Sequence, residues 1–421
     1  MGGGRRIWAE CLLGYLMQGL LALVFLIPAC TCAERLNILA IGQVMPGECL
    51  VPMWFDADPL VSYVLIPTDI DVMGGVGVAG QHVMEDAWRR YIRIYFPKTR
   101  QALVQGFDMI VFPDGYIEPF TATQKSDIRY ALENGLGSFV TMGGDMSGPT
   151  YKAYPGWKNS ILYELMPIEL TDNMKQDGSA FNIKVLKTDP PLLSAFVPFG
   201  IERISGSGFT YLYPREGTTT WARLFSSGLP SGAPGAWLVS WKCGPNGGYF
   251  WTVADDLDHP WWSFARNEYN MDIFLNILLF STGRRLPDDI LMIHELRNQF
   301  WHYNQERLLL LSLLEFVDRF GGNTRSLEEE IGAVDQEKER SFDQYRAQQF
   351  EEASSTIDAA IERILSTATN AMKLKDRALL WVYVTEWAAV TGTLSVSGLV
   401  VYSLLVKRRL YKEVMVTRSG V

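Results

Sequence analysis

The chain has 421 residues, of which 48% are hydrophobic and 12% aromatic, enough apolar material for one large domain with appendages or for two domains. Its formal net charge is −9 at pH 7. This acidic balance argues against a nucleic-acid-binding protein, because neutralising phosphates requires a concentrated basic face and the sequence has none.

The first 33 residues are predicted to be an export segment. Arg5 and Arg6 precede an apolar run over about 12–27, and small residues then lead to Ala33, as in a secretory signal peptide. The same run is nearly long enough to stay in a bilayer as an N-terminal anchor. The sequence leaves both alternatives open for residues 1–33, a cleaved signal peptide or a retained anchor.

Residues 34–285 begin with short apolar runs that alternate with helical patterns. Runs typical of buried parallel strands occur at 36–42, 61–67, 107–115 and 137–144. Helical patterns lie between or after them, at 82–96, 121–135 and 157–167, and the second of these starts with a capping box of Thr121 and Gln124. The alternation predicts an α/β domain with a parallel sheet, whose sites lie at the carboxyl ends of the strands.

Beyond residue 180 the pattern changes to additional β elements. Candidate strands lie within 181–193, 219–228 and 235–256, and the glycine-rich residues 244–248 predict a hairpin connection. An amphipathic helix is expected over 269–283, where Gly283 ends it.

The last third of the chain predicts a helical stalk over 286–377. A long helix is expected to end at Gly321 and Gly322. The acidic segment that follows has apolar positions at helical spacing, which favours an amphipathic helix over a solvated linker.

A transmembrane helix is predicted over 378–406. The twenty residues from Trp387 to Val406 carry no charge, and three basic residues follow at 407–409, which places the tail 407–421 in the cytoplasm. The domain over 34–285 and the stalk are then extracytoplasmic, and the protein crosses the cell membrane once, or twice if the N-terminal segment is retained.

Two of the five cysteines, Cys49 and Cys243, lie in the predicted extracytoplasmic part. Thiols in an oxidising compartment are candidates for a disulfide. The sequence alone does not decide whether these two meet.

Polar and glycine residues follow the predicted strands at their carboxyl ends. Asp114 and Gly115 come after the third run, and Gly143, Gly144 and Asp145 come after the fourth. Because parallel strands end at the same edge of a sheet, we expect these residues to form a ligand-binding pocket.

A second group of candidates lies further along the chain. Asp255, Asp256, Asp258 and His259 form the densest set of potential metal ligands, but their spacing matches no EF-hand loop. Trp261 and Trp262 stand beside His259 and are expected to line the same pocket, where they could stack on a ligand or, alternatively, pack in the core. No metal or other cofactor is predicted.

Residues 36–170 resemble the class I glutamine amidotransferase-like fold, a flavodoxin-like sheet, and in particular an amidotransferase-like family often found in membrane-associated proteins. The matching stretches are FDMIVFPDGY at 107–116 and GLGSFVTMGGDMSGPTYKAYPGWKNSILYELMPIEL at 135–170. A third stretch, GGYFWTVADDLDHPWW at 247–262, extends the resemblance to about 36–285.

The resemblance implies a cysteine nucleophile at a strand–helix corner and a histidine near the last strand. This chain has Gly143 and Gly144 at the corner, and His259 is the counterpart of the histidine. We therefore predict a pseudoenzyme, a non-catalytic membrane-anchored protein for binding or assembly in the cell envelope, whose partners are the membrane and other envelope proteins.

Two alternatives remain from the sequence. One is a hydrolase that uses Asp145 or Asp258 with His259, with or without a metal, which requires a hydrogen bond or one bridging water between the acid and the histidine. The other is a structural subunit of an envelope complex, which would present an apolar patch instead of a cleft.

Overall fold

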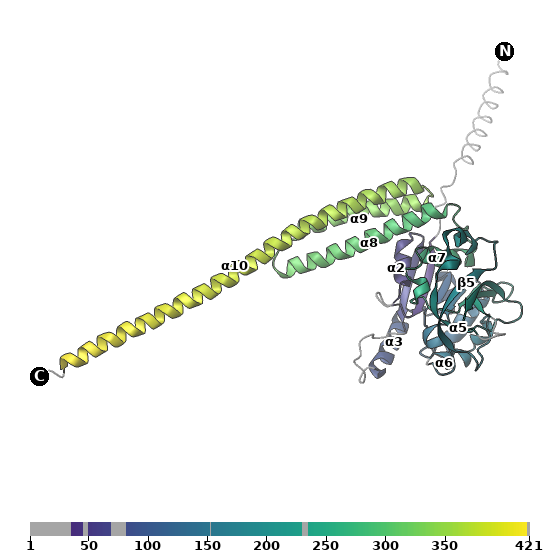
Figure 1. Cartoon of the computed structure of the whole chain (residues 1–421), viewed down its shortest axis with the longest axis horizontal. Helices are drawn as coiled ribbons and strands as arrows, with labels where there is room; N and C mark the ends of the chain where they lie inside the picture. The colour runs from purple at the N-terminus through teal and green to yellow at the C-terminus, as the bar shows by residue number, and fades with distance from the viewer. Residues whose placement is uncertain (1–34, 45–48, 69–80, 152, 230–234, 419–421) are drawn as a thin grey trace, which may run out of the picture. The chain divides into compact units, whose positions relative to one another are not determined.

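The computed structural model describes residues 35–44, 49–68, 81–151, 153–229 and 235–418 (Figure 1). The chain forms two compact units. The first, which we call the head, comprises Met1–Arg297 and Phe342–Ala353, and the second, the stalk unit, comprises Asn298–Ser341 and Ser354–Val421.

The head is built on a sheet of nine strands among the described residues. They are β1 (Leu36–Gly42), β2 (Val61–Pro67), β3 (Met109–Phe112), β4 (Gly137–Thr141), β5 (Gln176–Val185), β6 (Gly206–Thr210), β7 (Thr219–Ser226), β8 (Ala236–Lys242) and β9 (Tyr249–Val253). Their order across the sheet is β2-β1-β3-β4-β9-β8-β7-β5-β6.

The sheet has a parallel part and an antiparallel part. Strands β2, β1, β3, β4 and β9 are parallel to one another, and β8, β7, β5 and β6 continue the sheet in antiparallel pairs. The predicted α/β domain with added β elements is thus confirmed as a mixed α/β sheet, and the predicted hairpin joins β8 to β9.

Short helices connect these strands. The head contains α2 (Val51–Ala57), α3 (Gln81–Tyr95), α4 (Arg100–Gly106), α5 (Ala122–Glu133), α6 (Tyr154–Lys158) and α7 (Asn270–Ser281). Single 3-10 turns occur at η1 (Gly144–Met146), η2 (Tyr163–Leu165), η3 (Ser194–Phe199), η4 (Ile201–Arg203) and η5 (Pro260–Trp262). The capping box of Thr121 and Gln124 is confirmed at the start of α5.

The single helix expected over 157–167 is wrong. The chain instead forms α6 and then η2. Between them, the Ser160 hydroxyl accepts a hydrogen bond from the Leu162 backbone N–H at 3.2 Å. A side chain that satisfies a nearby backbone group in this way competes with helical hydrogen bonding and favours a break.

Helix α7 packs directly on one face of the sheet. In the strand register Phe139 pairs with Trp251, so both side chains point to the same face. Their ring centroids lie 5.2 Å from Phe274 and 6.1 Å from Phe280, respectively. Eleven residues of α7 are buried, so the amphipathic character expected for 269–283 is wrong: the helix is enclosed on its other sides as well.

The opposite face of the sheet is covered by α6. Phe112 is next to Val111, the partner of Phe139 in the register, and therefore points to the other face. Its ring meets Trp157 of α6 edge to face, with centroids 5.1 Å apart. Both faces of the parallel part are thus covered, as in α/β proteins generally.

A buried ionic network joins distant parts of the head. The Arg297 guanidinium contacts Asp58 Oδ2 at 2.7 Å and Asp272 Oδ1 at 2.8 Å, and all three side chains are almost completely buried. Asp58 Oδ2 also accepts a 3.4 Å hydrogen bond from Tyr345, and Asp272 Oδ2 lies 2.6 Å from His294 Nδ1. Burial lowers the pKa of Arg297, but the Asp58 charge and its other partners raise it more, so the guanidinium stays protonated.

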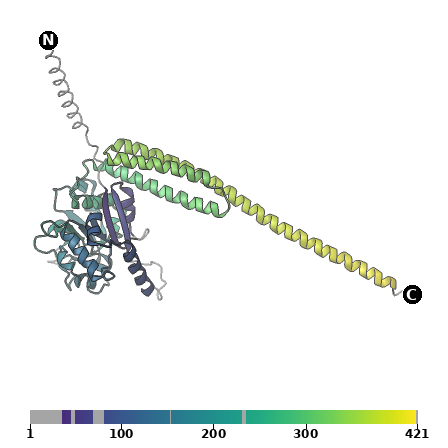
Figure 2. The same ribbon diagram turned by 180° about the vertical axis from the view of Figure 1, so that it is seen from behind.

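The stalk unit is a three-helix bundle that continues as one helix. Helices α8 (Ile290–Arg319), α9 (Arg325–Arg346) and the first part of α10 (Phe350–Arg418) lie side by side in both views (Figures 1 and 2). Arg307 Nε donates to Asp335 Oδ1 at 2.7 Å between α8 and α9, and Arg363 pairs with Glu337 between α10 and α9. The predicted stalk is therefore helical but folds back on itself.

Helix α10 contains a segment long and apolar enough to cross a membrane, within Phe350–Tyr411. The predicted span 378–406 falls inside it. Beyond Ala378, the described side chains of α10 are exposed as far as Tyr411, except the half-buried Leu379 and Val382. The predicted export segment, 1–33, lies outside the described residues.

We expect Arg297→Ala to lower the free energy of unfolding of the head by about 3–5 kcal/mol, because it leaves two buried carboxylates without their cation. Urea unfolding of the detergent-solubilised full chain, followed by tryptophan fluorescence, measures the change.

The matched control is Arg325→Ala, which removes an exposed ion pair with Glu329. Its effect is expected to stay below about 1 kcal/mol. Equal stability of Arg297→Ala and wild type would show that the network does not hold the head together.

Candidate functional site

The candidate residues gather at the edge of the sheet where the parallel strands end, which we call the carboxyl edge. Gln43 follows β1, Asp114 follows β3, Gly143 follows β4, and Asp255 and Asp256 follow β9. The parallel arrangement of these strands brings residues from across some 200 positions of the chain to one edge.

The glycine corner after β4 is filled by neighbouring carboxylates. Gly144 has φ +49°, and a Cβ atom there would lie 2.0 Å from Asp114 Oδ2. A Cβ atom on Gly143 would lie 2.7 Å from both Cβ and the backbone nitrogen of Asp256. The corner therefore accepts no side chain at either position, a cysteine included, without displacing an aspartate.

Asp114 itself is held in an uncommon backbone conformation. Its φ is +46°, which is rare for a residue other than glycine and is more readily adopted by aspartate than by most others. The Asp114 backbone N–H donates to Thr141 Oγ1 at 3.0 Å, and Trp157 Nε1 donates to the Gly115 carbonyl at 2.7 Å. These bonds fix the turn after β3 so that the Asp114 carboxylate faces Gly144.

The gap between β1 and β3, where an open α/β sheet commonly binds its ligand, is closed by backbone contacts. The direction of chain progression reverses here, since β2 lies on one side of β1 and β3 on the other. The Gln43 N–H donates to the Pro113 carbonyl at 2.7 Å, and a Cβ atom on Gly42 would lie 2.0 Å from that oxygen. The predicted ligand-binding residues Asp114, Gly115 and Gly143 are buried in this arrangement.

His259 is oriented by Asp255. Its Nδ1 lies 2.5 Å from Asp255 Oδ1 and 3.0 Å from the Gly208 carbonyl, and because both partners are acceptors, Nδ1 carries a proton. Its Nε2 is 4.0 Å from Asp258 Oδ1, beyond hydrogen-bond distance. The structure thus places His259 near Asp255 and Asp258, and only Asp255 is within hydrogen-bond distance. The side chain of Asp145, the other predicted partner, lies outside the described residues.

The buried acidic surroundings change the protonation of this cluster. Burial lowers the pKa of His259, but the hydrogen bond to Asp255 and the charges of Asp255, Asp256 and Asp258 raise it more, to about 9. Burial raises the pKa of Asp255 to about 7 against the opposing effect of His259. Burial and the charge of Asp256 raise the pKa of Asp258 to about 6. His259 is therefore an imidazolium at neutral pH.

Both described cysteines are free and buried. Cys49 is close enough to Asp256, Asp258 and Asp114 at the carboxyl edge to feel their charges, whereas Cys243 follows β8 beside the start of β9, at the other edge. They do not form the disulfide considered from the sequence. Burial is the main cause that raises the pKa of each thiol, to about 12 for Cys243 and higher still for Cys49. Neither thiol is therefore an activated nucleophile.

Trp261 and Trp262 are core residues in this structure. Both side chains are fully buried. Trp237 packs against them with ring centroids 4.5 and 5.8 Å away, and Trp54 lies 5.9 Å from Trp262. The rings stabilise the head behind the carboxyl edge and present no exposed stacking surface. Over the described part of the chain, no three His, Cys, Asp or Glu side chains are placed to hold a metal ion.

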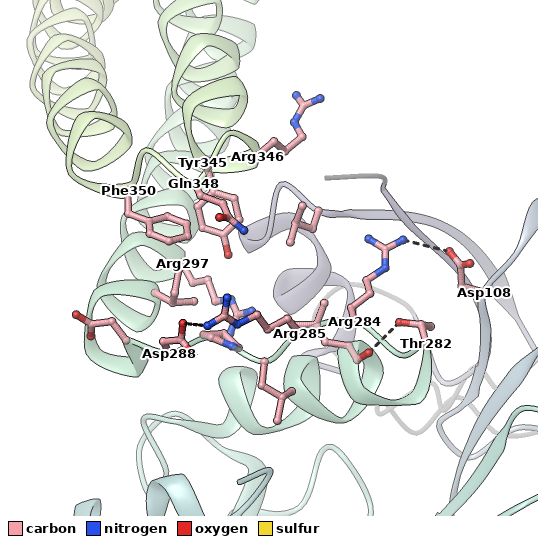
Figure 3. A pocket seen from close by; sticks show the side chains of 16 residues that line it. Asp108, Thr282, Arg284, Arg285, Asp288, Arg297, Tyr345, Arg346, Gln348 and Phe350 are labelled. Atoms are coloured by element: carbon pink, nitrogen blue, oxygen red, sulfur yellow. Dashed lines mark hydrogen bonds and ion pairs between the residues drawn. The ribbon is translucent and has the colours of Figure 1, made fainter. Parts of the chain in front are cut away.

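A cavity of about 660 Å³ lies at the opposite edge of the sheet, near the starts of β2 and β3 (Figure 3). Its size is within the range of small-molecule sites. Its polar lining includes Asp108, Thr282, Arg284, Arg285, Asp288, Tyr345 and Gln348, and its apolar lining includes Leu60, Leu279, Leu286, Ile293 and Phe350. The sequence analysis missed this cavity, because its residues come from segments without a motif.

Hydrogen bonds and ion pairs hold the cationic groups of the cavity in place. Arg284 donates to the Arg35 carbonyl at 2.8 Å and lies 3.9 Å from Asp108. Arg285 pairs with Asp288 at 2.5 Å on the exposed side. The buried Arg297 forms part of the wall. A ligand in this cavity would contact guanidinium groups as well as aliphatic side chains.

No protein-family model matches this chain, and no curated protein matches it. A solved structure described as "mmIFT52 N-terminal domain" aligns with 49% of this chain and 91% of that domain, at 14% sequence identity and a TM-score of 0.26. A TM-score this low establishes neither a shared fold nor a shared function.

The His259–Asp255 pair predicts that the head loses stability as the pH rises. The pKa of His259 is about 9 in the folded chain, against an ordinary 6.5. The stabilisation from its protonated form is therefore complete below about pH 6.5 and is lost as the pH rises through 9. The pKa of Asp255 is raised from 3.8 to about 7, so this group also lowers the stability of the head as the pH rises from 3.8 to about 7. We expect the midpoint of thermal unfolding to fall by roughly 5 °C from about pH 6 to about pH 9.

Comparison with His259→Gln isolates this contribution, since glutamine can still donate to Asp255 but does not titrate. The variant should show a clearly smaller fall over the same pH range, while His302→Gln, which alters a half-exposed histidine, should follow wild type. Parallel pH profiles for wild type and His259→Gln would refute the assignment.

Proposed function

We propose that this protein is a non-catalytic, membrane-anchored binding or assembly protein whose head is a degenerate class I glutamine amidotransferase-like domain. The observation that carries the proposal is the corner after β4. Gly144 has the positive φ of a strained strand–helix turn, and the Asp114 carboxylate occupies the space of its missing side chain. A nucleophile at this position would have to displace the Asp114 carboxylate.

The strand order supports the resemblance on which the proposal rests. The parallel strands follow the order β2-β1-β3-β4-β9, and the flavodoxin-like arrangement has its strands in the order 2-1-3-4-5. The last parallel strand is followed by His259, the position at which the resemblance places the family's histidine.

The geometry favours binding over the hydrolase alternative. A general acid or base must reach its partner within hydrogen-bond distance or through one water. His259 Nδ1 is already engaged by Asp255 and Gly208, and its Nε2 is 4.0 Å from Asp258. Its raised pKa keeps it protonated, so it is a poor base at neutral pH.

Binding by the head then takes place away from the carboxyl edge. The described residues of that edge are engaged by packing and backbone hydrogen bonds, whereas the cavity at the opposite edge has volume, cationic groups and apolar walls. We assign the binding function of the head to this cavity.

Anchoring is provided by α10. Its uncharged stretch from Trp387 to Val406 matches the thickness of a bilayer, and the basic residues 407–409 favour a cytoplasmic location for the tail. The head and the bundle are then extracytoplasmic, as part of the cell envelope.

Restoring a cysteine should not restore an amidotransferase. We expect Gly144→Cys to release no ammonia from glutamine and to lower the free energy of unfolding by about 2 kcal/mol or more, because the new side chain meets Asp114 in a left-handed backbone conformation. A coupled ammonia assay and urea unfolding of the full chain measure the two effects.

The matched control is Gly332→Cys, since Gly332 has open space around its Cα. Glutamine hydrolysis by the wild-type chain that disappears in His259→Gln would overturn the non-catalytic assignment.

Membrane anchoring predicts that Leu399→Arg weakens retention of the full chain in membranes, because arginine near the centre of a span costs about 2.5–3.5 kcal/mol. Alkaline extraction of membranes and flotation of the extracted material measure retention. Leu309→Arg serves as the control, since Leu309 is equally exposed in the bundle but lies outside the span. Equal retention of both variants would contradict a span at this position.

A further inference from the structure

The turn between α8 and α9 carries an exposed pair of aromatic rings. Phe316 and Phe320 are 39% and 40% exposed, and their ring centroids are 4.7 Å apart. Helix α8 ends here because Gly321 adopts φ +76°, and the Gly322 N–H bonds back to the Val317 carbonyl at 3.0 Å. The two rings therefore lie at the end of the helical hairpin, where they are partly exposed to solvent in the stalk unit.

Hydrogen bonds within the bundle give the position of this turn along α10. Gln299 of α8 donates to Ser354 and Asp358, which are 55 and 59 residues further along the chain. Helices α8 and α10 run in the same direction, since α9 reverses the chain between them, and they rise equally per residue. Phe320 therefore lies beside residues 375–379 of α10, in agreement with the view in Figure 1, where α10 continues past the turn.

The apolar part of α10 begins beside the α8–α9 turn, at residues 375–379. Among the side chains of α10 that are described, Ala378 is the last buried one, and Leu380 and Trp381 shortly after it are more than 60% exposed. At 1.5 Å per residue, positions 375–379 lie within about 3–12 Å of Trp381 and Tyr383, the residues expected at the headgroup level. The phenylalanine pair thus stands at the height of the membrane interface.

The charges at this level show no basic excess. The basic side chains are Arg319, Arg325, Lys373, Lys375 and Arg377, and the acidic ones are Glu315, Asp318, Glu328, Glu329, Glu330, Asp376 and Glu386. With more acidic than basic groups, electrostatic attraction to anionic lipid is weak. Any attraction to the bilayer therefore comes from burial of the two rings.

We infer that the α8–α9 turn is a second membrane contact, in which Phe316 and Phe320 insert into the lipid headgroup region beside α10. The inference rests on the proposed anchoring by α10 and adds a partner surface to it. An inserted turn fixes the bundle at two points on the bilayer, where α10 alone would leave it free to tilt.

A second copy of the chain is the competing occupant, and α8 allows the two to be separated. Leu309 is 64% exposed on α8, about 17 Å further from the membrane than Phe320. A partner helix packed along α8 would cover Leu309 as well as the rings, whereas lipid would reach the rings alone.

The test uses photo-crosslinking in the full chain, reconstituted into phosphatidylcholine vesicles. Single substitutions by p-benzoylphenylalanine are made at three positions, Phe320, Leu309 and Leu399. After irradiation, intact-mass measurement detects lipid adducts, and denaturing electrophoresis detects crosslinked chains of doubled mass.

We expect lipid adducts at Phe320 and Leu399, at least tenfold more than at Leu309, and no dimer band at Phe320. A dimer band at Phe320 and Leu309, or a Phe320 adduct yield as low as that at Leu309 while Leu399 reacts with lipid, would overturn the second contact and leave the anchor intact. Absence of adducts at Leu399 would overturn the anchoring itself, and the second contact with it.

Discussion

The head depends on one buried cation. Arg297 is bound by carboxylates from the end of α2 and from α7, which are 239 and 25 residues away from it in sequence. Removing these charges from water is costly, and the cost is offset only while each partner keeps its place. The network therefore fixes the first strand connection, the helix behind the sheet and the start of α8 relative to one another. Tyr345, from the segment between α9 and α10, joins the same network through Asp58. Tyr345, which precedes the helix with the candidate membrane span, is thus part of the head's ionic core.

Close packing also fills the described part of the carboxyl edge. Asp114 fills the volume beside Gly144, the Gln43 backbone binds the Pro113 carbonyl, and Asp255 holds His259. Asp114 and Gln43 are engaged by residues that follow a neighbouring strand, and Asp255 is engaged by His259 of the same turn after β9. Asp255 and His259 form an ion pair near the buried Asp256 and the exposed Asp258. These negative charges stabilise the imidazolium, which is a poor base for hydrolysis. The cavity of about 660 Å³ lies instead at the amino ends of β2 and β3.

In the stalk unit, the change from buried to exposed side chains marks two environments along one helix. As far as Ala378, α10 contributes alternating small and aliphatic side chains to the bundle, supported by ion pairs such as Arg363 with Glu337. Beyond Ala378 its described apolar side chains are exposed, except the half-buried Leu379 and Val382. Apolar surface of this extent is stable only in an apolar medium, which is why composition, exposure and length together point to lipid. The phenylalanine pair on the neighbouring turn lies at this boundary.

The sequence alone determined the features that depend on local pattern. Apolar runs located β1, β2, β3 and β4, the capping box located α5, Gly321 and Gly322 located the end of α8, and the uncharged stretch located the candidate span, because periodicity, capping and hydrophobic length are local properties. The tertiary structure decided everything that depends on partners distant in sequence. It decided that Asp114 fills the corner at Gly144, that Trp261 and Trp262 are core residues, and that the stalk folds back as a hairpin. Strand order and packing across the whole sheet set these contacts, and no local pattern predicts them. Asp255 and His259 are an i,i+4 pair, but the conformation of the turn after β9 decides that Asp255 and not Asp258 orients His259.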